Sequence, residues 1–289
     1  MVFCVRSASG ASMAARGRQE KRHRRGRCAL LLDRRAESPF GVRGETADRG
    51  REVAMRDIEP GSLPPDLSGV PTLGPRLRDQ PDWMYLLREY YELYRHLSAG
   101  GSERIRAHQR AVREAIGRLI RTNAPLHLPT PARLPVTAHF KRALDEGRMD
   151  RLAQVVRALE SVQDLLTWQY GYDKMPKGLT RSYGYAQIAG PGGPVESGDV
   201  ILGIVLFAPG CTYPAHAHKG IAESYICLSG AVSENHTGVF APGSQIFNPP
   251  DHMHRITVSA TEPALLAYAW IGAPEVLSAN RMRFSRPRL

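Results

Sequence analysis

The chain has 289 residues, 39 Lys and Arg against 28 Asp and Glu, a formal net charge of +11, and 42% hydrophobic residues. This length is enough for one or two domains with a sizeable core, and the hydrophobic content is that of an ordinary globular protein. No apolar run reaches the roughly 18 residues of a membrane-spanning helix, so stable membrane insertion is not expected.

The positive charge is concentrated near the N-terminus. Residues 1–54 hold 13 Lys and Arg against 6 Asp and Glu, whereas the rest of the chain holds 26 against 22. Three interpretations of this basic tail are open: a disordered segment that binds polyanions, an Arg-rich targeting segment, or sequence upstream of a functional start at Met55. We favour the third, because a folded pattern follows Met55. We therefore expect no nucleic-acid partner.

The four cysteines show no CxxC pairing. Cys4 and Cys28 fall in the basic tail, and Cys211 and Cys227 fall near the C-terminal third of the chain. Reduced thiols in a cytosol are the simplest interpretation. The sequence therefore predicts a cytoplasmic protein.

Residues 55–180 are predicted to form a helical region. Apolar residues recur there at helical spacing, and Ser102 after the Gly100–Gly101 break is a candidate N-cap. Such helices would cover one face of a neighbouring domain or form a dimer contact. The expected helices span approximately residues 83–97, 105–120, 137–146 and 149–166.

Residues 181–289 have a different pattern. After Gly171 the apolar period changes towards two, and glycine, proline and β-branched residues mark short strands up to about Ile271. The predicted fold class is therefore α+β, with an N-terminal helical region joined to a small C-terminal β-barrel.

A cluster of metal-binding side chains lies in the stretch from Gly210 to Gly230. His216 and His218 are two residues apart, so on a strand they share a face. Glu223 follows a short turn, so the two strands of one hairpin could carry all three ligands. Three imidazoles, with His254 as the third, and one carboxylate favour a divalent transition metal over calcium or magnesium.

The second half of the site reads GVFAPGSQIFNPPDHMHRITV. Turns are predicted at Pro242–Gly243 and at 248–251, with a short strand at 244–247 between them. His252 and His254 then share one strand face. His252 is expected to lie outside the ligand set or to be exposed, and His236 is expected to be solvated.

Two tyrosines flank the predicted ligands. Tyr225 lies two residues after Glu223, so its phenol is expected to point into the same cavity, while Tyr213 is expected at the barrel rim. A phenol has a pKa near 10, about three units too high for a base at neutral pH. A nearby dication lowers that pKa and can yield a phenolate. We therefore predict that Tyr225 is a base and not merely a core residue.

These motifs resemble those of the cupin superfamily. Its first motif is matched by Gly210, His216, His218, Glu223 and Gly230, and its second by Pro242–Gly243, Pro249 and His254. The resemblance implies a jelly-roll β-barrel in which His254, rather than His252, is the fourth metal ligand.

A narrower resemblance is to the cupin-type dimethylsulfoniopropionate (DMSP) lyases, in particular to their DddL-type branch. Members cleave DMSP to dimethyl sulfide and acrylate. The resemblance implies metal binding by His216, His218, Glu223 and His254, proton abstraction by Tyr225 and an assisting role for Tyr213. It also implies one divalent metal ion, such as zinc, iron or manganese. The resemblance covers residues 183–195, 202–218, 233–257, 265–272 and 283–288.

The zwitterionic substrate fits these residues. Its carboxylate would bind the metal, and its sulfonium would rest against aromatic faces, each contributing roughly 0.5–2 kcal/mol. Candidates for these faces, which barrel packing could also explain, are Tyr183, Tyr185, Phe247, Tyr268 and Trp270.

Two other classes of function use a similar barrel. Three histidines and a glutamate also suit ferrous iron, so a mononuclear iron dioxygenase is an alternative. A non-catalytic cupin sensor is a further one, although the helical region has no strong DNA-recognition helix. A homodimer through the helices is expected from the family likeness and the apolar stripes.

Overall fold

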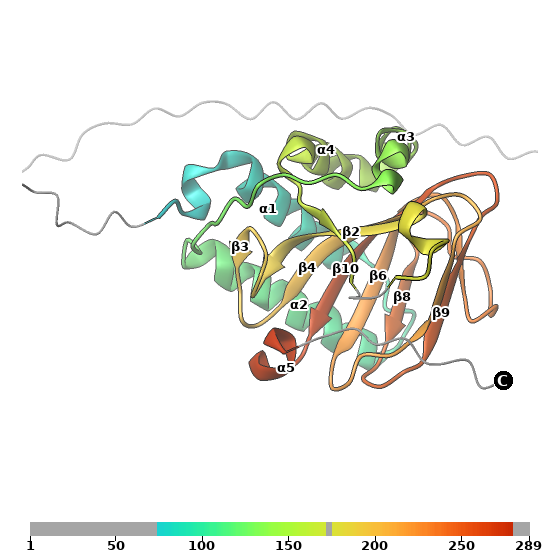
Figure 1. Ribbon diagram of the computed structural model, residues 1–289. Coiled ribbons are helices and arrows are strands. Elements are labelled where there is room, and N and C mark those ends of the chain that lie inside the picture. The colour runs from blue at the N-terminus through green and yellow to red at the C-terminus, as the bar shows by residue number, and fades with distance from the viewer. Residues whose placement is uncertain (1–73, 172–174, 280–289) are drawn as a thin grey trace, which may run out of the picture. The chain divides into compact units, whose positions relative to one another are not determined.

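The structure is a computed structural model that describes residues 74–171 and 175–279 (Figure 1). The basic tail at 1–54, the expected start at Met55 and the motif at 283–288 lie outside these described residues. The described helices and strands belong to one compact unit. The domain boundaries expected after residues 54 and 180 stay predictions.

The first two helices confirm the sequence pattern. After a 3₁₀ turn at Leu77–Asp79, α1 spans Pro81–His96 and α2 spans Glu103–Arg121. Ser102 is the N-cap of α2, because its side chain accepts a hydrogen bond from the Ile105 amide at 3.3 Å. One face of α1 is fully buried and contributes Trp83, Leu86, Leu87, Tyr90, Leu93 and Tyr94 to the core.

The next two helices are shorter than expected. A 3₁₀ turn at Pro135–His139 leads into α3 at Phe140–Gly147. The single helix predicted at 149–166 is instead a 3₁₀ turn at 150–152, α4 at Ala153–Ser161 and a 3₁₀ turn at 163–165. The backbone of Asp150 has a φ of 44°, outside the right-handed helical region, so a helix cannot run through it.

In the described part of the chain, ten strands form two antiparallel sheets, apart from one parallel pair, β2–β3. The large sheet has the order β1-β2-β4-β10-β6-β8, with β3 paired to β2, and the small sheet has the order β5-β9-β7. The large-sheet strands are β1 (Trp168–Gln169), β2 (Tyr183–Gly190), β3 (Val195–Glu196), β4 (Ile201–Phe207), β6 (Ala222–Ser229), β8 (Gln245–Asn248) and β10 (Ala264–Ile271). The small-sheet strands are β5 (Thr212–His216), β7 (Val232–Glu234) and β9 (His254–Val258). A 3₁₀ turn at Leu179–Arg181 precedes β2, and α5 (Pro274–Ser278) follows β10.

Helices α1 to α4 cover the outer face of the large sheet, as one of the two sequence expectations proposed (Figure 1). Tyr90 of α1 donates a 2.8 Å hydrogen bond to the Gly203 carbonyl of β4, and the Tyr94 hydroxyl lies 2.8 Å from Ser224 Oγ of β6. Side chains alternate along the central strands between this layer and the barrel interior. Every residue of β4 is buried because the sheet is covered on both faces.

One motif glycine has a backbone requirement. Gly230 ends β6 with a φ of 73°, and a Cβ there would lie 2.2 Å from the Pro263 carbonyl oxygen. Only glycine meets both conditions without displacing the neighbouring chain. This glycine therefore lets the ligand-bearing strand β6 end next to Pro263.

Candidate active site

The four predicted metal ligands come together. One ligand atom from each of His216, His218, Glu223 and His254 lies within 4.8 Å of the others. All four side chains are buried, with 1%, 4%, 0% and 0% exposure respectively. The sequence spacing therefore identified a real cluster of three imidazoles and one carboxylate.

The expectation that one hairpin carries three ligands was wrong. β5 ends at His216 and pairs with β9 of the small sheet, whereas β6, which carries Glu223, pairs with β8 and β10 of the large sheet. The turn at Gly220, with a φ of 69°, takes the chain from one sheet to the other. The ligands therefore face each other across the barrel.

A β-bulge determines where Tyr213 points. It lies three positions before His216, which on a regular strand would place the two side chains on opposite faces. The β5–β9 pairing shifts register between Tyr213 and His216, so both side chains are buried and their rings lie 4.7 Å apart between centroids. Tyr213 is 2% exposed and lies inside the barrel rather than at its rim.

The imidazole hydrogen bonds suit metal binding. His216 Nδ1 lies 2.9 Å from the Pro214 carbonyl and His254 Nδ1 lies 3.1 Å from the His252 carbonyl. Donation from Nδ1 leaves the Nε2 lone pair free to bind a metal. Among the described residues, His216 Nε2 and both ring nitrogens of His218 are buried without a hydrogen-bond partner, which suits atoms that would bind a metal.

The electrostatics give the same result. Burial, and next the neighbouring His254, lower the pKa of His216 to about 3, and burial lowers the pKa of His218. Burial alone would raise the pKa of Glu223, but the three imidazoles, led by His218, hold it below its ordinary value. His254 differs, because burial lowers its pKa but the contact with Glu223, 3.0 Å between Nε2 and Oε2, raises it overall. Imidazoles beside an ionised carboxylate form the donor set that a divalent transition metal takes.

Both oxygens of Glu223 are held by neighbouring strands. Trp270 Nε1 of β10 donates to Oε1 at 2.6 Å, and Asn248 Nδ2 of β8 donates to Oε2 at 3.3 Å. Sequence reasoning missed Asn248, since an asparagine before two prolines was interpreted as a turn. The one available clue was its place at the end of a predicted strand.

Tyr225 occupies the same face of β6 as Glu223. It is 5% exposed, and its ring lies 6.2 Å from that of His254 between centroids. A small cavity of about 20 Å³, room for one water molecule, lies beside it. The other side chains that line this cavity are Tyr183, Tyr185, Val205, Tyr213, Tyr268 and Trp270. The structure therefore gathers both predicted catalytic tyrosines and four of the five predicted aromatic residues.

Phe247, the fifth aromatic residue, lies elsewhere. It pairs with Ser224 in the β6–β8 ladder, so it shares the outer face of the sheet with that serine. Its ring packs against His108 of α2 at 5.1 Å between centroids. Strand alternation excludes it from the cavity, because Glu223 and Tyr225 point the other way. His252 and His236 are exposed, as expected.

A wider hollow of about 180 Å³ adjoins the small cavity. Tyr185, Tyr268 and Trp270 line both spaces. The hollow adds Gln187 of β2 and Ser278 of α5 as polar lining. The two spaces therefore share an aromatic wall.

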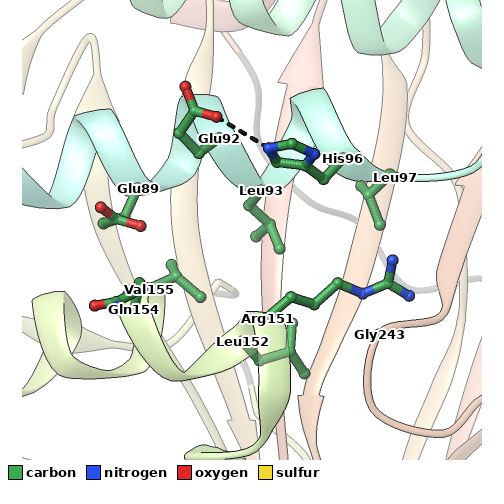
Figure 2. A pocket seen from close by; sticks show the side chains of 10 residues that line it. All are labelled: Glu89, Glu92, Leu93, His96, Leu97, Arg151, Leu152, Gln154, Val155 and Gly243. Atoms are coloured by element: carbon green, nitrogen blue, oxygen red, sulfur yellow. Dashed lines mark ion pairs between the residues drawn. The ribbon is translucent and has the colours of Figure 1, made fainter. Parts of the chain in front are cut away.

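A separate cavity of about 260 Å³ lies between α1 and α4 (Figure 2). Leu93, Leu152 and Val155 form its apolar part, and Glu92 at its edge pairs with His96 at 3.2 Å. None of the predicted site residues lines it. It is therefore not part of the candidate active site.

A β-barrel of two facing sheets with histidines and a glutamate inside it defines the chain as a cupin. The dimethylsulfoniopropionate lyase family matches residues 107–266. A Cereibacter sphaeroides protein assigned as the dimethylsulfoniopropionate lyase DddL is 50% identical over 213 residues, covering 74% of this chain and 92% of that protein. The chain therefore belongs to the dimethylsulfoniopropionate lyase family, a family of carbon–sulfur lyases.

Solved structures support the fold. The DMSP lyase DddQ from Ruegeria pomeroyi DSS-3 has a TM-score of 0.55 at 19% identity, covering 72% of this chain and 98% of that chain. A structure from a study of the DMSP lyases RdDddP and RnDddQII has a TM-score of 0.52 at 18% identity, covering 71% and 98%. In the described part of the chain, no helix is both long and apolar enough to cross a membrane.

Proposed function

We propose that this protein cleaves dimethylsulfoniopropionate to dimethyl sulfide and acrylate by β-elimination, with Tyr225 as the base. The observation that carries the proposal is the position of Tyr225. It follows the ligand Glu223 by two residues on β6, and both side chains are buried on the face that lines the barrel interior. A phenol there lies beside the place where a substrate carboxylate would bind.

The residues that would hold the metal are His216, His218, Glu223 and His254. The buried, unpartnered ring nitrogens of His216 and His218 and the lowered pKa values of both imidazoles support a divalent transition metal. When bound, such an ion supplies positive charge that binds a carboxylate and favours the negative charge that develops beside it. The ligand set does not choose between zinc, iron and manganese.

The proposed β-elimination moves one proton and breaks one C–S bond. Tyr225, as phenolate, takes the proton from the carbon next to the carboxylate, and the C–H electron pair forms the new C=C bond. The C–S bond breaks, and its electrons leave with sulfur as neutral dimethyl sulfide. General-base help of this kind is typically worth about 10²–10⁴-fold in rate. Tyr213, whose hydroxyl donates to that of Tyr183 at 3.2 Å, would orient the substrate.

The aromatic lining suits the cationic end of the substrate. Tyr185 and Tyr268 meet edge to face with 6.4 Å between ring centroids, and Trp270 lies 5.5 Å from Tyr268. These side chains line both the small cavity and the wider hollow. A sulfonium placed there would contact ring faces while the carboxylate reaches the histidines. Phe247 has no part in this proposal.

The test is headspace detection of dimethyl sulfide from purified protein. The Tyr225→Phe variant is expected to keep its metal and to lose at least about 100-fold in kcat. Tyr85→Phe is a matched control, because its exposed hydroxyl on α1 donates a 3.2 Å hydrogen bond to Gln154, away from the proposed ligands. Near-normal turnover by Tyr225→Phe, or full activity of metal-free protein, would contradict the proposal.

Because the chain belongs to a lyase family, the lyase is favoured over the dioxygenase and the sensor as its function. Release of dimethyl sulfide under strictly anaerobic conditions would separate the lyase from an oxygen-dependent enzyme. The cytoplasmic location and the homodimer through the helices stay predictions. Light scattering of the purified protein would test the homodimer.

A further inference from the structure

A buried amide lies behind the proposed ligand Glu223. Asn248 ends β8 opposite Glu223 in the β6–β8 ladder, and its Nδ2 donates to Glu223 Oε2 at 3.3 Å. The same amide lies close enough to Glu234 to lower the pKa of that carboxyl group. Asn248 is 2% exposed and Glu234 is 8% exposed. One neutral amide therefore lies between two buried carboxyl groups.

The two carboxyl groups come from different sheets. Glu223 is on β6 of the large sheet, whereas Glu234 is on β7 of the small sheet, opposite Ile256 of β9. The ligand His254 begins β9, two residues before Ile256. Asn248 thus connects the two sheets immediately behind the ligand cluster.

The amide can serve both carboxyl groups in one orientation only. A carboxylate accepts hydrogen bonds, so it is matched by the NH₂ group of an asparagine and not by its carbonyl oxygen. Asn248 Oδ1 has no hydrogen-bond partner among the described residues. This agrees with an orientation in which the NH₂ group faces Glu223 and Glu234.

This arrangement is unfavourable for folding alone. A buried carboxyl group destabilises the folded state unless it is fully hydrogen-bonded, and Glu234 Oε1 is buried without a partner in the described part of the chain. Burial raises the pKa of Glu234, and the Asn248 amide acts against that rise. Two apolar side chains in place of Asn248 and Glu234 would destabilise the folded state less. The polar pair is therefore expected to serve the metal site.

We propose that Asn248, backed by Glu234, is a positioning residue that fixes the Glu223 carboxylate for metal binding. The proposal rests on the metal site of the proposed function. Trp270 fixes Oε1 at 2.6 Å, and Asn248 fixes Oε2. With both contacts the carboxylate has one orientation. Without Asn248, Oε2 keeps only its 3.0 Å contact with His254 Nε2, an atom that would itself bind the metal.

The test is the affinity of the metal-free protein for Zn²⁺ and Co²⁺, measured by competition with a chromophoric chelator. Removing an outer hydrogen-bond partner of a ligand typically costs 10–100-fold in metal affinity. Asn248→Ala is expected to lose affinity in that range. The Co²⁺ absorption spectrum is expected to change as well, because the ligand geometry is altered.

Gln245→Ala is the matched control. Gln245 is also an amide on β8, but its Oε1 accepts a 2.7 Å hydrogen bond from Gln109 of α2, on the helix side of the sheet. This variant loses a part-buried amide contact without touching the ligands. It is expected to lower the unfolding midpoint and to leave metal affinity within about twofold of wild type, as a contact remote from the ligands should.

The double variant Asn248→Ala/Glu234→Gln separates positioning from stability. Asn248→Ala leaves the Glu234 carboxyl group unpartnered, and Glu234→Gln removes its charge. The double variant is therefore expected to regain thermal stability and to remain weak in metal binding.

Each outcome decides a different claim. If both Asn248 variants bind metal like wild type, the positioning role is wrong while the proposed function stands. The same holds if metal affinity recovers together with stability in the double variant. If wild-type protein itself binds neither ion, the proposed function fails and this inference fails with it.

Discussion

Trp270 lies opposite Glu223 in the β10–β6 ladder, and its indole Nε1 donates a 2.6 Å hydrogen bond to Glu223 Oε1. Its ring also lies 4.5 Å from that of His218 between centroids. One side chain therefore contacts two of the four proposed ligands. The sequence suggested only that Trp270 offers a face to a cation.

The first prediction concerns this indole. Trp270→Phe keeps an aromatic face but removes the N–H donor, so metal affinity is expected to fall by about 10–100-fold. Chelator competition measures this affinity. Trp168→Phe is the control, because Trp168 is also buried but packs against Phe140 at 5.0 Å, away from the ligands. Equal metal affinity in the two variants would show that the hydrogen bond has no role in holding the ion.

The second prediction concerns Tyr268, which lines both the small cavity and the wider hollow. A cation–π contact is worth about 0.5–2 kcal/mol, which corresponds to roughly 2–30-fold in affinity. Tyr268→Leu is expected to raise KM for dimethylsulfoniopropionate by a factor in that range, with a smaller effect on kcat. Tyr91→Leu on α1 is the control for the loss of an aromatic ring. An unchanged KM in Tyr268→Leu would show that Tyr268 does not contact the cation.

The third prediction concerns stability. Ser224 is fully buried, and its Oγ lies 2.8 Å from both the Tyr94 hydroxyl and His108 Nε2. Ser224→Ala would leave two buried polar groups without this partner, at about 1–3 kcal/mol for each unsatisfied group. Tyr94→Phe removes one bond and leaves Ser224 paired with His108, so a loss near 1 kcal/mol is expected. Urea unfolding would measure both, and a smaller loss for Ser224→Ala than for Tyr94→Phe would refute this assignment.

The fourth prediction concerns pH. Burial lowers the pKa of His108 to about 4 from a model-peptide value of 6.5, against an opposing effect of Glu223. Between these values the unfolded chain binds a proton that the native state does not, so the free energy of unfolding falls as pH falls from 6.5 towards 4. A shift of this size corresponds to a loss on the order of 3 kcal/mol.

His108→Gln tests this origin of the pH dependence. Glutamine offers a polar group to Ser224 but does not titrate, so the slope of stability against pH in this window should be reduced. Urea midpoints from pH 4 to pH 7 would show the difference, with His96→Gln as a control for an exposed histidine on α1. Parallel curves for wild type and His108→Gln would assign the acid sensitivity to other groups.

The metal ligands could be predicted because the residues that identify them lie close together in the sequence. His216, His218 and Glu223 fall within eight residues, and each residue type is a metal donor by itself. Likewise, the period of α1 and the N-cap Ser102 lie within the elements that they define. Patterns of this kind depend only on sequence neighbours, so the pairing of distant strands does not alter them.

The errors arose at residues whose side-chain direction depends on pairing with a strand distant in the sequence. Phe247 was expected in the cavity, but its pairing with Ser224 places it on the outer face, and the sequence does not show that register. The bulge that turns Tyr213 inward is equally invisible, because it arises from pairing with β9. Asn248 and Glu234 are separated by 14 positions, so only the closed barrel shows that they meet.

Three consecutive residues of β6 point alternately to the barrel interior and to the helices outside it. Glu223 and Tyr225 point into the barrel, while Ser224 points outward to hydroxyl and imidazole groups from α1 and α2. A shortened enzyme made of the strands alone would lose those contacts and bare the apolar outer face of its large sheet. Anyone seeking a minimal, portable catalyst from this scaffold would therefore have to retain the helices from Pro81 onward, although they supply none of the proposed metal ligands.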